Sequence, residues 1–134
     1  MLKNNRVFTS YSVKDLAEAK KFYQQTLGLN VSESPMGILE LNVNDGNQIW
    51  LYPKPDHQPA TYTVLNFTVD DLDETVNQLN QSGIRLEQYH NQYINTDSKG
   101  IFCDDQGPRI GWFKDPSGNI ISVIDQSDRA KKSK

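Results

Sequence analysis

Histidine and cysteine, the residues most often used for acid–base, nucleophilic and metal chemistry near neutral pH, are scarce in this sequence. The two histidines, His57 and His90, lie in polar, turn-rich segments, where we expect them to face solvent. Cys103 is the only cysteine, and an acidic neighbour at 104 does not favour its reactive thiolate. Arg109 is the one obvious cation near the last predicted hairpin and could meet an anionic ligand, although a surface role is the simpler interpretation. Any site therefore depends on how the fold assembles residues.

The sequence contains one short pattern twice, which indicates how the chain is built. Val13–Glu18 reads VKDLAE and returns as Val69–Glu74, VDDLDE, 56 residues later (71 − 15). Such self-similarity is typical of a supersecondary unit that buries its apolar face by stacking on a copy of itself. We therefore expect two copies of one unit, with any site between them.

Each copy begins as a strand followed by a helix. The stretches 7–13 and 62–69 are rich in β-branched and aromatic residues, which favour strands. Asp15 and Asp71 can cap the helices that follow, each with a Glu three residues later as in a capping box. Gly28 and Gly83 stand where each helix would end.

Three short strands are expected after each helix. In the first copy they are 29–32, 38–43 and 48–52, and in the second 84–89, 109–114 and 119–125. The second copy holds about 16 extra residues, which fall in the polar stretch 91–107. Each copy therefore reads as strand, helix and three strands, a βαβββ module.

Composition indicates one small domain and excludes several classes of partner. We expect a single domain over residues 1–126, made of modules 6–53 and 61–125, and a disordered polar tail over 127–134. A net charge of −3 argues against nucleic acid, and no apolar run of 18 residues or leader suggests a membrane. The lone cysteine fits a cytoplasmic location, and only 36% hydrophobic residues favours a homodimer that buries more of the sheets.

The order and spacing of several motifs resemble a known superfamily. Val13–Leu16 (VKDL), Phe22-Tyr23, Leu27–Leu29 (LGL) and Trp112–Ile121 (WFKDPSGNII) are similar to the vicinal oxygen chelate superfamily of glyoxalases, bleomycin-resistance proteins and extradiol dioxygenases. The resemblance spans about residues 7–125. It implies an α+β, glyoxalase-like fold in which two tandem βαβββ modules curl around a cavity, often within a dimer.

The resemblance also locates the positions where the family's enzymes hold a divalent metal. Relative to the capping Asp and the turn Gly, these positions are Phe8, Trp50, Val64 and Ser122. None of these side chains is a good ligand for a divalent ion, which takes imidazole or carboxylate. No His, Cys, Asp or Glu lies within two residues of any of them, so a shifted alignment restores no ligand. We therefore expect no metal and no other cofactor.

Strand alternation indicates what the cavity would present instead. The residues expected to bind a ligand are Phe8, Ser10, Trp50, Tyr52, Val64, Asn66 and Ser122. The aromatic rings would stack on a flat, partly apolar molecule, and the hydroxyl and amide groups would orient it. Trp50 and Phe8 could equally fill the core. Val7, Val13, Leu65, Phe67 and Val69 should form the opposite, helix-covered face.

Two classes of function remain. The first is a metal-free protein that binds a small organic molecule, as bleomycin-resistance members of the superfamily do. The second is an enzyme: a metal-free lyase or isomerase using Tyr52 or a loop residue as acid, or a glyoxalase-type metalloenzyme with other ligands. We favour binding, because no candidate base is recognisable on the cavity face. The stretch 91–107, with apolar Tyr93, Ile101 and Phe102, is predicted to close over the cavity mouth above Trp50.

Overall fold

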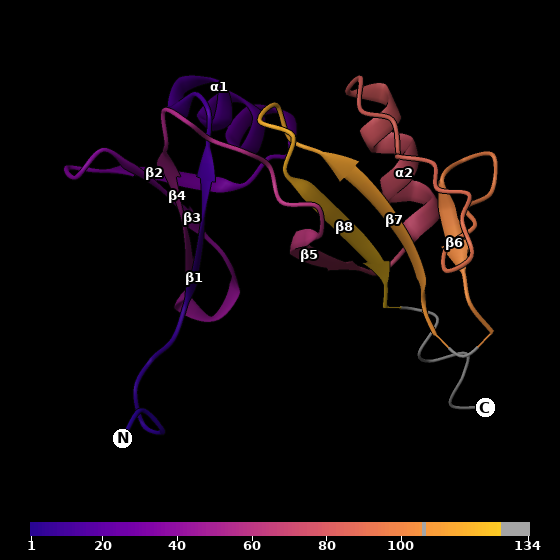
Figure 1. The fold of residues 1–134 in the computed structure, drawn as a ribbon, viewed down its shortest axis with the longest axis horizontal. Helices are drawn as coiled ribbons and strands as arrows, with labels where there is room; N and C mark the ends of the chain where they lie inside the picture. The colour runs from indigo at the N-terminus through magenta and orange to yellow at the C-terminus, as the bar shows by residue number, and fades with distance from the viewer. Residues whose placement is uncertain (106, 127–134) are drawn as a thin grey trace. The chain divides into compact units, whose positions relative to one another are not determined.

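The computed structural model describes residues 1–105 and 107–126, which form two compact units. The first unit spans Met1–Pro59 and the second begins at Ala60. Each unit contains one four-stranded sheet and the helix that follows its first strand (Figure 1). The predicted α+β fold with two tandem modules is therefore confirmed. The predicted disordered tail, 127–134, lies outside the described residues.

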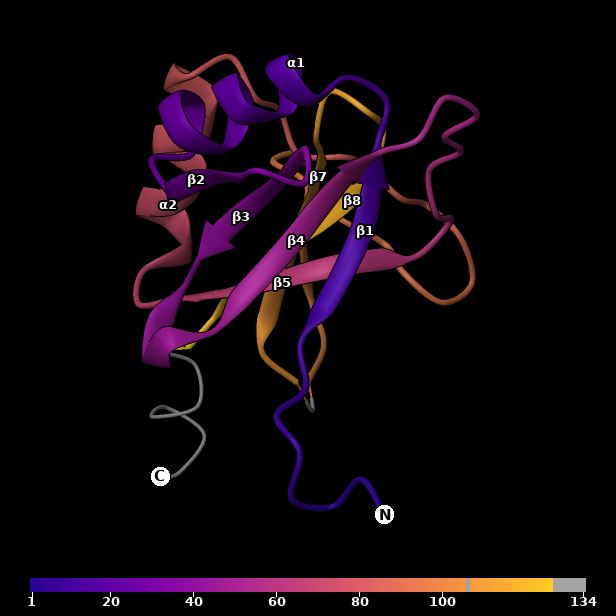
Figure 2. The ribbon, with the colours of Figure 1, turned by 90° about the vertical axis from the view of Figure 1, so that its left-hand side faces the viewer.

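The first unit follows the strand–helix–three-strand order. Its elements are β1 (Thr9–Val13), α1 (Leu16–Lys20), a π-helical turn (Lys21–Thr26), β2 (Asn30–Ser34), β3 (Ile38–Asn42), a 3-10 turn (Asn44–Gly46) and β4 (Gln48–Pro53). The strand order is β1-β4-β3-β2, with β1 parallel to β4 and the other pairs antiparallel. Figure 2 shows β4 between β1 and β3. The hairpins link neighbouring strands, while α1 returns the chain to the far edge of the sheet.

The second unit repeats this topology. Its elements are β5 (Thr63–Val69), α2 (Leu72–Gln81), β6 (Ile101–Cys103), β7 (Arg109–Lys114) and β8 (Ile120–Asp125). The strand order is β5-β8-β7-β6, and β5 is parallel to β8 (Figure 1). The first and last strands of each module are thus hydrogen-bonded neighbours at the same position of each sheet.

Both helices begin at the predicted caps. The Asp15 carboxylate accepts a hydrogen bond from the Glu18 amide at 3.0 Å, and Asp71 accepts one from Glu74 at 3.1 Å. The first helix widens into the π-helical turn, where Leu27 N donates to Phe22 O at 2.9 Å. This wider turn has no signal in the capping or periodicity patterns.

One predicted strand is wrong. Residues 84–89 form an irregular segment, and the edge strand is instead β6, which lies inside the stretch predicted to be a lid. The segment still runs beside β7, because Glu87 N donates to Trp112 O at 2.7 Å. The outer edge of β7 is therefore shared: β6 pairs with Arg109–Gly111, and Glu87 of the irregular segment bonds to the next residue, Trp112.

Leu86 anchors this irregular segment to the sheet. A Cβ atom built on Gly111 would lie 2.7 Å from Leu86 Cδ1, and one built on Gly100 would lie 2.5 Å from Leu86 Cβ. Gly100 also has a positive φ of 90°, a backbone conformation that side chains disfavour. Leu86 therefore occupies space left by two missing side chains, which holds the segment in place without a strand ladder.

Each sheet buries one face against the helix of its own unit. In the first unit the buried face comprises Tyr11, Val13, Val31, Leu39, Leu41, Ile49 and Leu51, which pack with Ala19 and Tyr23. The Tyr11 hydroxyl donates to the buried Tyr23 hydroxyl at 2.8 Å. In the second unit the buried face includes Leu65, Phe113, Ile121 and Val123, with Leu72, Val76 and Leu79 from α2.

Val7 was predicted on the helix-covered face and is not there. It precedes β1 and is 84% exposed. The ladder between β1 and β4 begins only at Thr9 opposite Ile49, so Val7 has no neighbouring strand to hold it. Val13 and Leu65 are buried and Phe67 and Val69 half-buried, in agreement with the prediction.

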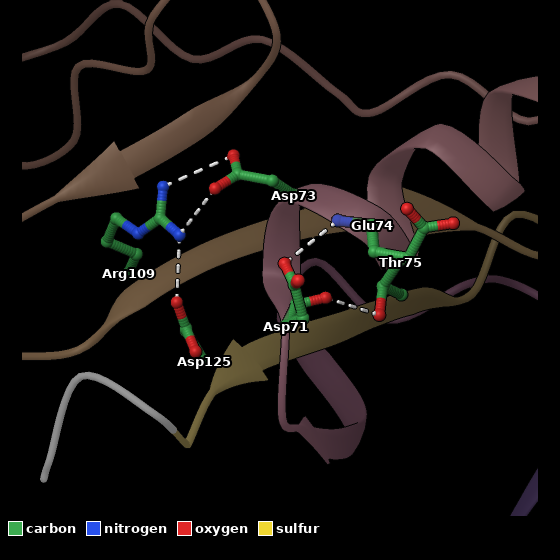
Figure 3. Close-up of polar contacts among 6 residues, drawn as sticks. All are labelled: Asp71, Asp73, Glu74, Thr75, Arg109 and Asp125. Atoms are coloured by element: carbon green, nitrogen blue, oxygen red, sulfur yellow. Dashed lines mark hydrogen bonds and ion pairs between the residues drawn. The ribbon is translucent and has the colours of Figure 1, made fainter.

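Arg109 joins α2 to the end of the second sheet (Figure 3). Its Nη2 lies 2.8 Å from Asp125 Oδ2 on β8 and 3.0 Å from Asp73 Oδ2 in the first turn of α2. The Asp125 side chain is only 1% exposed, whereas that of Asp73 is 56% exposed. The hydrogen bond from Arg109 lowers the pKa of Asp73 below its ordinary 3.8. Arg109 is thus a structural tie rather than the surface cation expected from sequence.

We predict that Asp125→Asn lowers the free energy of unfolding by about 2 kcal/mol, because it removes the charge from a buried carboxylate that hydrogen-bonds to a guanidinium. The same change at the more exposed Asp73 should cost less than about 1 kcal/mol. Urea unfolding followed by circular dichroism measures both.

The small cost of Asp73→Asn should also depend on pH. A carboxylate with a lowered pKa stabilises the fold above its unfolded value, 3.8, and loses that contribution as the pH falls through the lower folded value. The difference from wild type should therefore shrink below pH 3.8. Equal losses for the two variants at pH 7 would contradict this account of the tie.

Candidate functional site

The face of the first sheet that points away from α1 is polar and aromatic. We call it the first open face; it is formed by Ser10, Ser12, Ser32, Glu40, Asn42, Gln48, Trp50 and Tyr52. These residues alternate with the buried ones along each strand, as a sheet with one covered face requires. Three of the residues predicted to bind a ligand, Ser10, Trp50 and Tyr52, lie on it.

Aromatic side chains gather on the first open face. The Phe8 ring lies 4.8 Å from the Trp50 ring, centroid to centroid, with the planes tilted by 54°. Phe8 is 46% exposed and Tyr52 is 38% exposed, and Trp50 is half-buried. Isolated exposed aromatics are common, but here Trp50 and Tyr52 share the first open face and Phe8, just before β1, packs against Trp50. Trp50 is therefore not enclosed in the core, and its ring with that of Phe8 forms an accessible apolar surface.

A chain of hydrogen bonds fixes the indole of Trp50. Trp50 Nε1 donates to Gln48 Oε1 at 3.2 Å, and Gln48 Nε2 donates to Asn42 Oδ1 at 2.9 Å. Asn42 Nδ2 donates to Ser32 Oγ at 3.1 Å, and the Ser32 hydroxyl donates to Glu40 Oε1 at 2.8 Å. Each residue in this series donates to the next one, so the series ends at the Glu40 carboxylate, which accepts.

His57 is not the solvent-facing residue that the sequence suggested. Its Nδ1 lies 2.6 Å from Ser12 Oγ, within hydrogen-bond distance, and the residue is half-buried. The chain returns here because Lys54 N donates to Val13 O at 3.1 Å and His57 N donates to Lys54 O at 2.9 Å. The turn-forming sequence after β4 was the signal that could have placed His57 beside β1.

The second sheet has an equivalent uncovered face, which we call the second open face. Of the other predicted ligand-binding residues, Asn66 and Ser122 lie on it, directly opposite each other on neighbouring strands, whereas Val64 lies in the β-bulge between Thr63 and Leu65 and has no register partner on β8. The Ser122 hydroxyl donates to Asn66 Oδ1 and is only 1% exposed. Asn66 is exposed, so it is more accessible to a ligand than its hydrogen-bond partner Ser122. Val64 is half-buried.

Trp112 organises the rest of the second open face. Its ring contacts Tyr89 edge-on at 5.6 Å and Phe102 at 6.1 Å, and its Nε1 donates to Thr63 Oγ1 at 3.2 Å. A β-bulge between Thr63 and Leu65 interrupts the register with β8. Burial raises the pKa of the Tyr89 hydroxyl. Phe102, predicted to belong to a lid, therefore packs within its own sheet.

Comparison with known proteins decides the family. The profile of the Glyoxalase/Bleomycin resistance protein/Dioxygenase superfamily matches residues 6–123. The chain belongs to this superfamily. No curated protein matches it. Among the described residues, no helix is long and apolar enough to cross a membrane.

Several solved structures share the superfamily fold. A superfamily member from Sphaerobacter thermophilus is 21% identical, with a TM-score of 0.67 over 90% of this chain and 98% of that one. The fosfomycin resistance protein FosX of Listeria monocytogenes is 17% identical, with a TM-score of 0.67 over 91% and 93%. An antibiotic-binding protein from Streptomyces sp. CB03234 is 22% identical, with a TM-score of 0.65 over 91% and 97%.

The positions that hold a metal in enzymes of this superfamily do not fit one here. Phe8 and Trp50 place aromatic rings that contact each other where ligands would stand, Val64 is aliphatic, and the Ser122 hydroxyl donates to Asn66. Borderline divalent ions are held by imidazole, thiolate or carboxylate groups. In the described ranges, 1–105 and 107–126, no three His, Cys, Asp or Glu side chains come together as a metal site.

Proposed function

We propose that this chain is a metal-independent binding protein that sequesters a small aromatic or antibiotic-like molecule. The observation that carries this proposal is the accessible aromatic surface of Phe8, Trp50 and Tyr52 on the first open face. Aromatic rings beside a few oriented polar groups are typical of sites for flat organic ligands. Ser10 is exposed next to Trp50 on the neighbouring strand and supplies a hydroxyl for orientation.

The state of the indole supports stacking over hydrogen bonding as its role. Because Trp50 Nε1 already donates to Gln48, the indole offers a ligand its π face. The chain of hydrogen bonds behind it holds that face in one orientation before a ligand arrives, which reduces the entropy lost on binding. In the second unit, taken by itself, we propose Val64, Asn66 and Ser122 as further ligand-contacting residues, with Asn66 as the exposed polar group.

The names of two neighbours agree with this proposal. One is called a fosfomycin resistance protein and another an antibiotic-binding protein. At 17% and 22% identity they establish a shared fold, so the ligand class rests on the aromatic surface of this chain.

A second candidate is a metal-independent lyase or isomerase. The contact between Ser12 and His57 favours it, because an imidazole can accept or donate a proton at a neighbouring hydroxyl. Ser12 is also directly opposite Tyr52, the proposed acid. The two candidates differ in one respect: His57→Ala should leave ligand affinity intact in a binding protein, and should abolish turnover in an enzyme.

We predict that a neutral bicyclic aromatic probe, 2-naphthalenemethanol, shifts the indole N–H signal of Trp50 in ¹H–¹⁵N NMR spectra. The chain has two tryptophans, so Trp50→Phe and Trp112→Phe assign the two signals. Trp112, which is already enclosed by Tyr89, Phe102 and Thr63, is the internal control. A titration in which the Trp50 signal never moves, or in which only Trp112 responds, contradicts the proposed site.

The lack of ligands at Phe8, Trp50, Val64 and Ser122 gives a prediction about metal content. Purified protein incubated with zinc, nickel, iron or manganese and then mildly chelated should retain much less than one metal per chain in elemental analysis. Retention of about one metal per chain would restore the metalloenzyme alternative.

We also propose that the protein is a cytoplasmic homodimer. Its low hydrophobic content, 36%, limits how much of the sheets one chain can cover, and a symmetric pair buries more. Light scattering should give twice the chain mass of 15.3 kDa at micromolar concentration. A monomer mass at every concentration would contradict the dimer.

A further inference from the structure

The first sheet carries very little charge. Its four strands contain two charged residues, Glu33 on β2 and Glu40 on β3. They point to opposite faces, since odd and even positions of a strand alternate. Glu33 lies on the side of α1 and pairs with Lys20 at 2.7 Å. Glu40 lies on the first open face.

Glu40 has no basic partner among the described residues. Its one recorded side-chain contact is the hydrogen bond from Ser32, and it is half-buried. A carboxylate that loses part of its hydration normally gains a cation in exchange. Glu40 is the final acceptor of the hydrogen-bond chain from Trp50, and its donor, the Ser32 hydroxyl, carries no positive charge. The first open face thus carries one negative charge, that of Glu40, with no positive side chain paired to it among the described residues.

Glu40 is the direct cross-strand neighbour of Trp50. The two Cα atoms are register partners in the antiparallel pair β3–β4, and the side chains share one face. Side chains at such positions have Cβ atoms about 5 Å apart. Aromatic faces attract cations through their quadrupole, and a carboxylate attracts them by charge, so both features at this place favour the same group on a ligand.

We infer that Glu40 is the counter-ion for a positively charged ligand, and that the molecule bound on the first open face is a planar aromatic carrying a quaternary or protonated nitrogen. This inference rests on the proposed binding function and adds the chemical class of the ligand. The Trp50 face packs on the ring system with the Phe8 ring beside it, and Glu40 lies beside the cationic nitrogen of the ligand. Glu40 therefore sets specificity, while the rings supply the surface.

The test compares three bicyclic aromatic probes of similar size and different charge: N-methylquinolinium, 2-naphthalenemethanol and 2-naphthoate. Affinities are read from the Trp50 indole signal at low salt. We expect the cation to bind about tenfold more tightly than the neutral alcohol, and the anion most weakly. Only the cation should lose affinity as the salt concentration rises, because screening weakens charge interactions.

Glu40→Gln isolates the charge, because the amide oxygen can still accept the hydrogen bond from Ser32. This variant should bind the cation and the neutral alcohol equally, with unchanged affinity for the alcohol. Glu33→Gln is the matched control: it makes the same change in net charge in the same sheet, on the other face, and should keep the preference for the cation. Thermal unfolding confirms that both variants fold.

The outcomes separate this inference from the proposed function. If the alcohol and the cation bind equally to wild type, or if Glu33→Gln reduces the preference as much as Glu40→Gln, the role of Glu40 is wrong and the binding function stands. If none of the three probes moves the Trp50 signal, the proposed function fails and the ligand class fails with it.

Discussion

Each sheet of this protein can bury only one of its faces against the helix that its own module supplies. The rest of the structure depends on this constraint. One helix per module covers the alternate residues that include Leu39, Leu51, Ile121 and Val123, and the remaining residues of every strand must face elsewhere. A substitution on an uncovered face should therefore disturb the core less than one on the helix-covered face. In this chain the uncovered faces carry aromatic, hydroxyl and amide groups where enzymes of the superfamily hold a metal.

The local parts of the fold were predictable from sequence, because short-range chemistry determines them. Asp15 and Asp71 cap their helices, and the hairpins join the strands expected on either side of them. Side-chain alternation also placed Trp50 and Ser10 on the uncovered face. Residues 84–89 were not predictable, since the choice between that segment and β6 depends on Leu86 packing against two distant glycines. Apolar content alone does not reveal such a long-range contact.

The candidate site was predictable only in part, for a related reason. Phe8, just before β1, and Trp50 on β4 could be named because they stand at fixed spacing from sequence motifs. Glu40 and His57 were missed because they reach the same face from β3 and from the segment after β4, through register and a turn. Arg109 was taken for a surface cation because its partners, Asp73 and Asp125, are 36 and 16 residues away in sequence.

The contact between Leu86 and its two glycines has a consequence for how related sequences can diverge. The Leu86 side chain fills the space that side chains at Gly100 and Gly111 would occupy. The packing therefore fixes the total side-chain volume of these three positions. A relative with alanine at the position of Gly111 needs a residue smaller than leucine at the position of Leu86. A relative that keeps leucine there needs glycine at the position of Gly111. These positions should therefore vary together across descendants of this chain, as a correlated substitution that links the segment after α2 to the edge of β7.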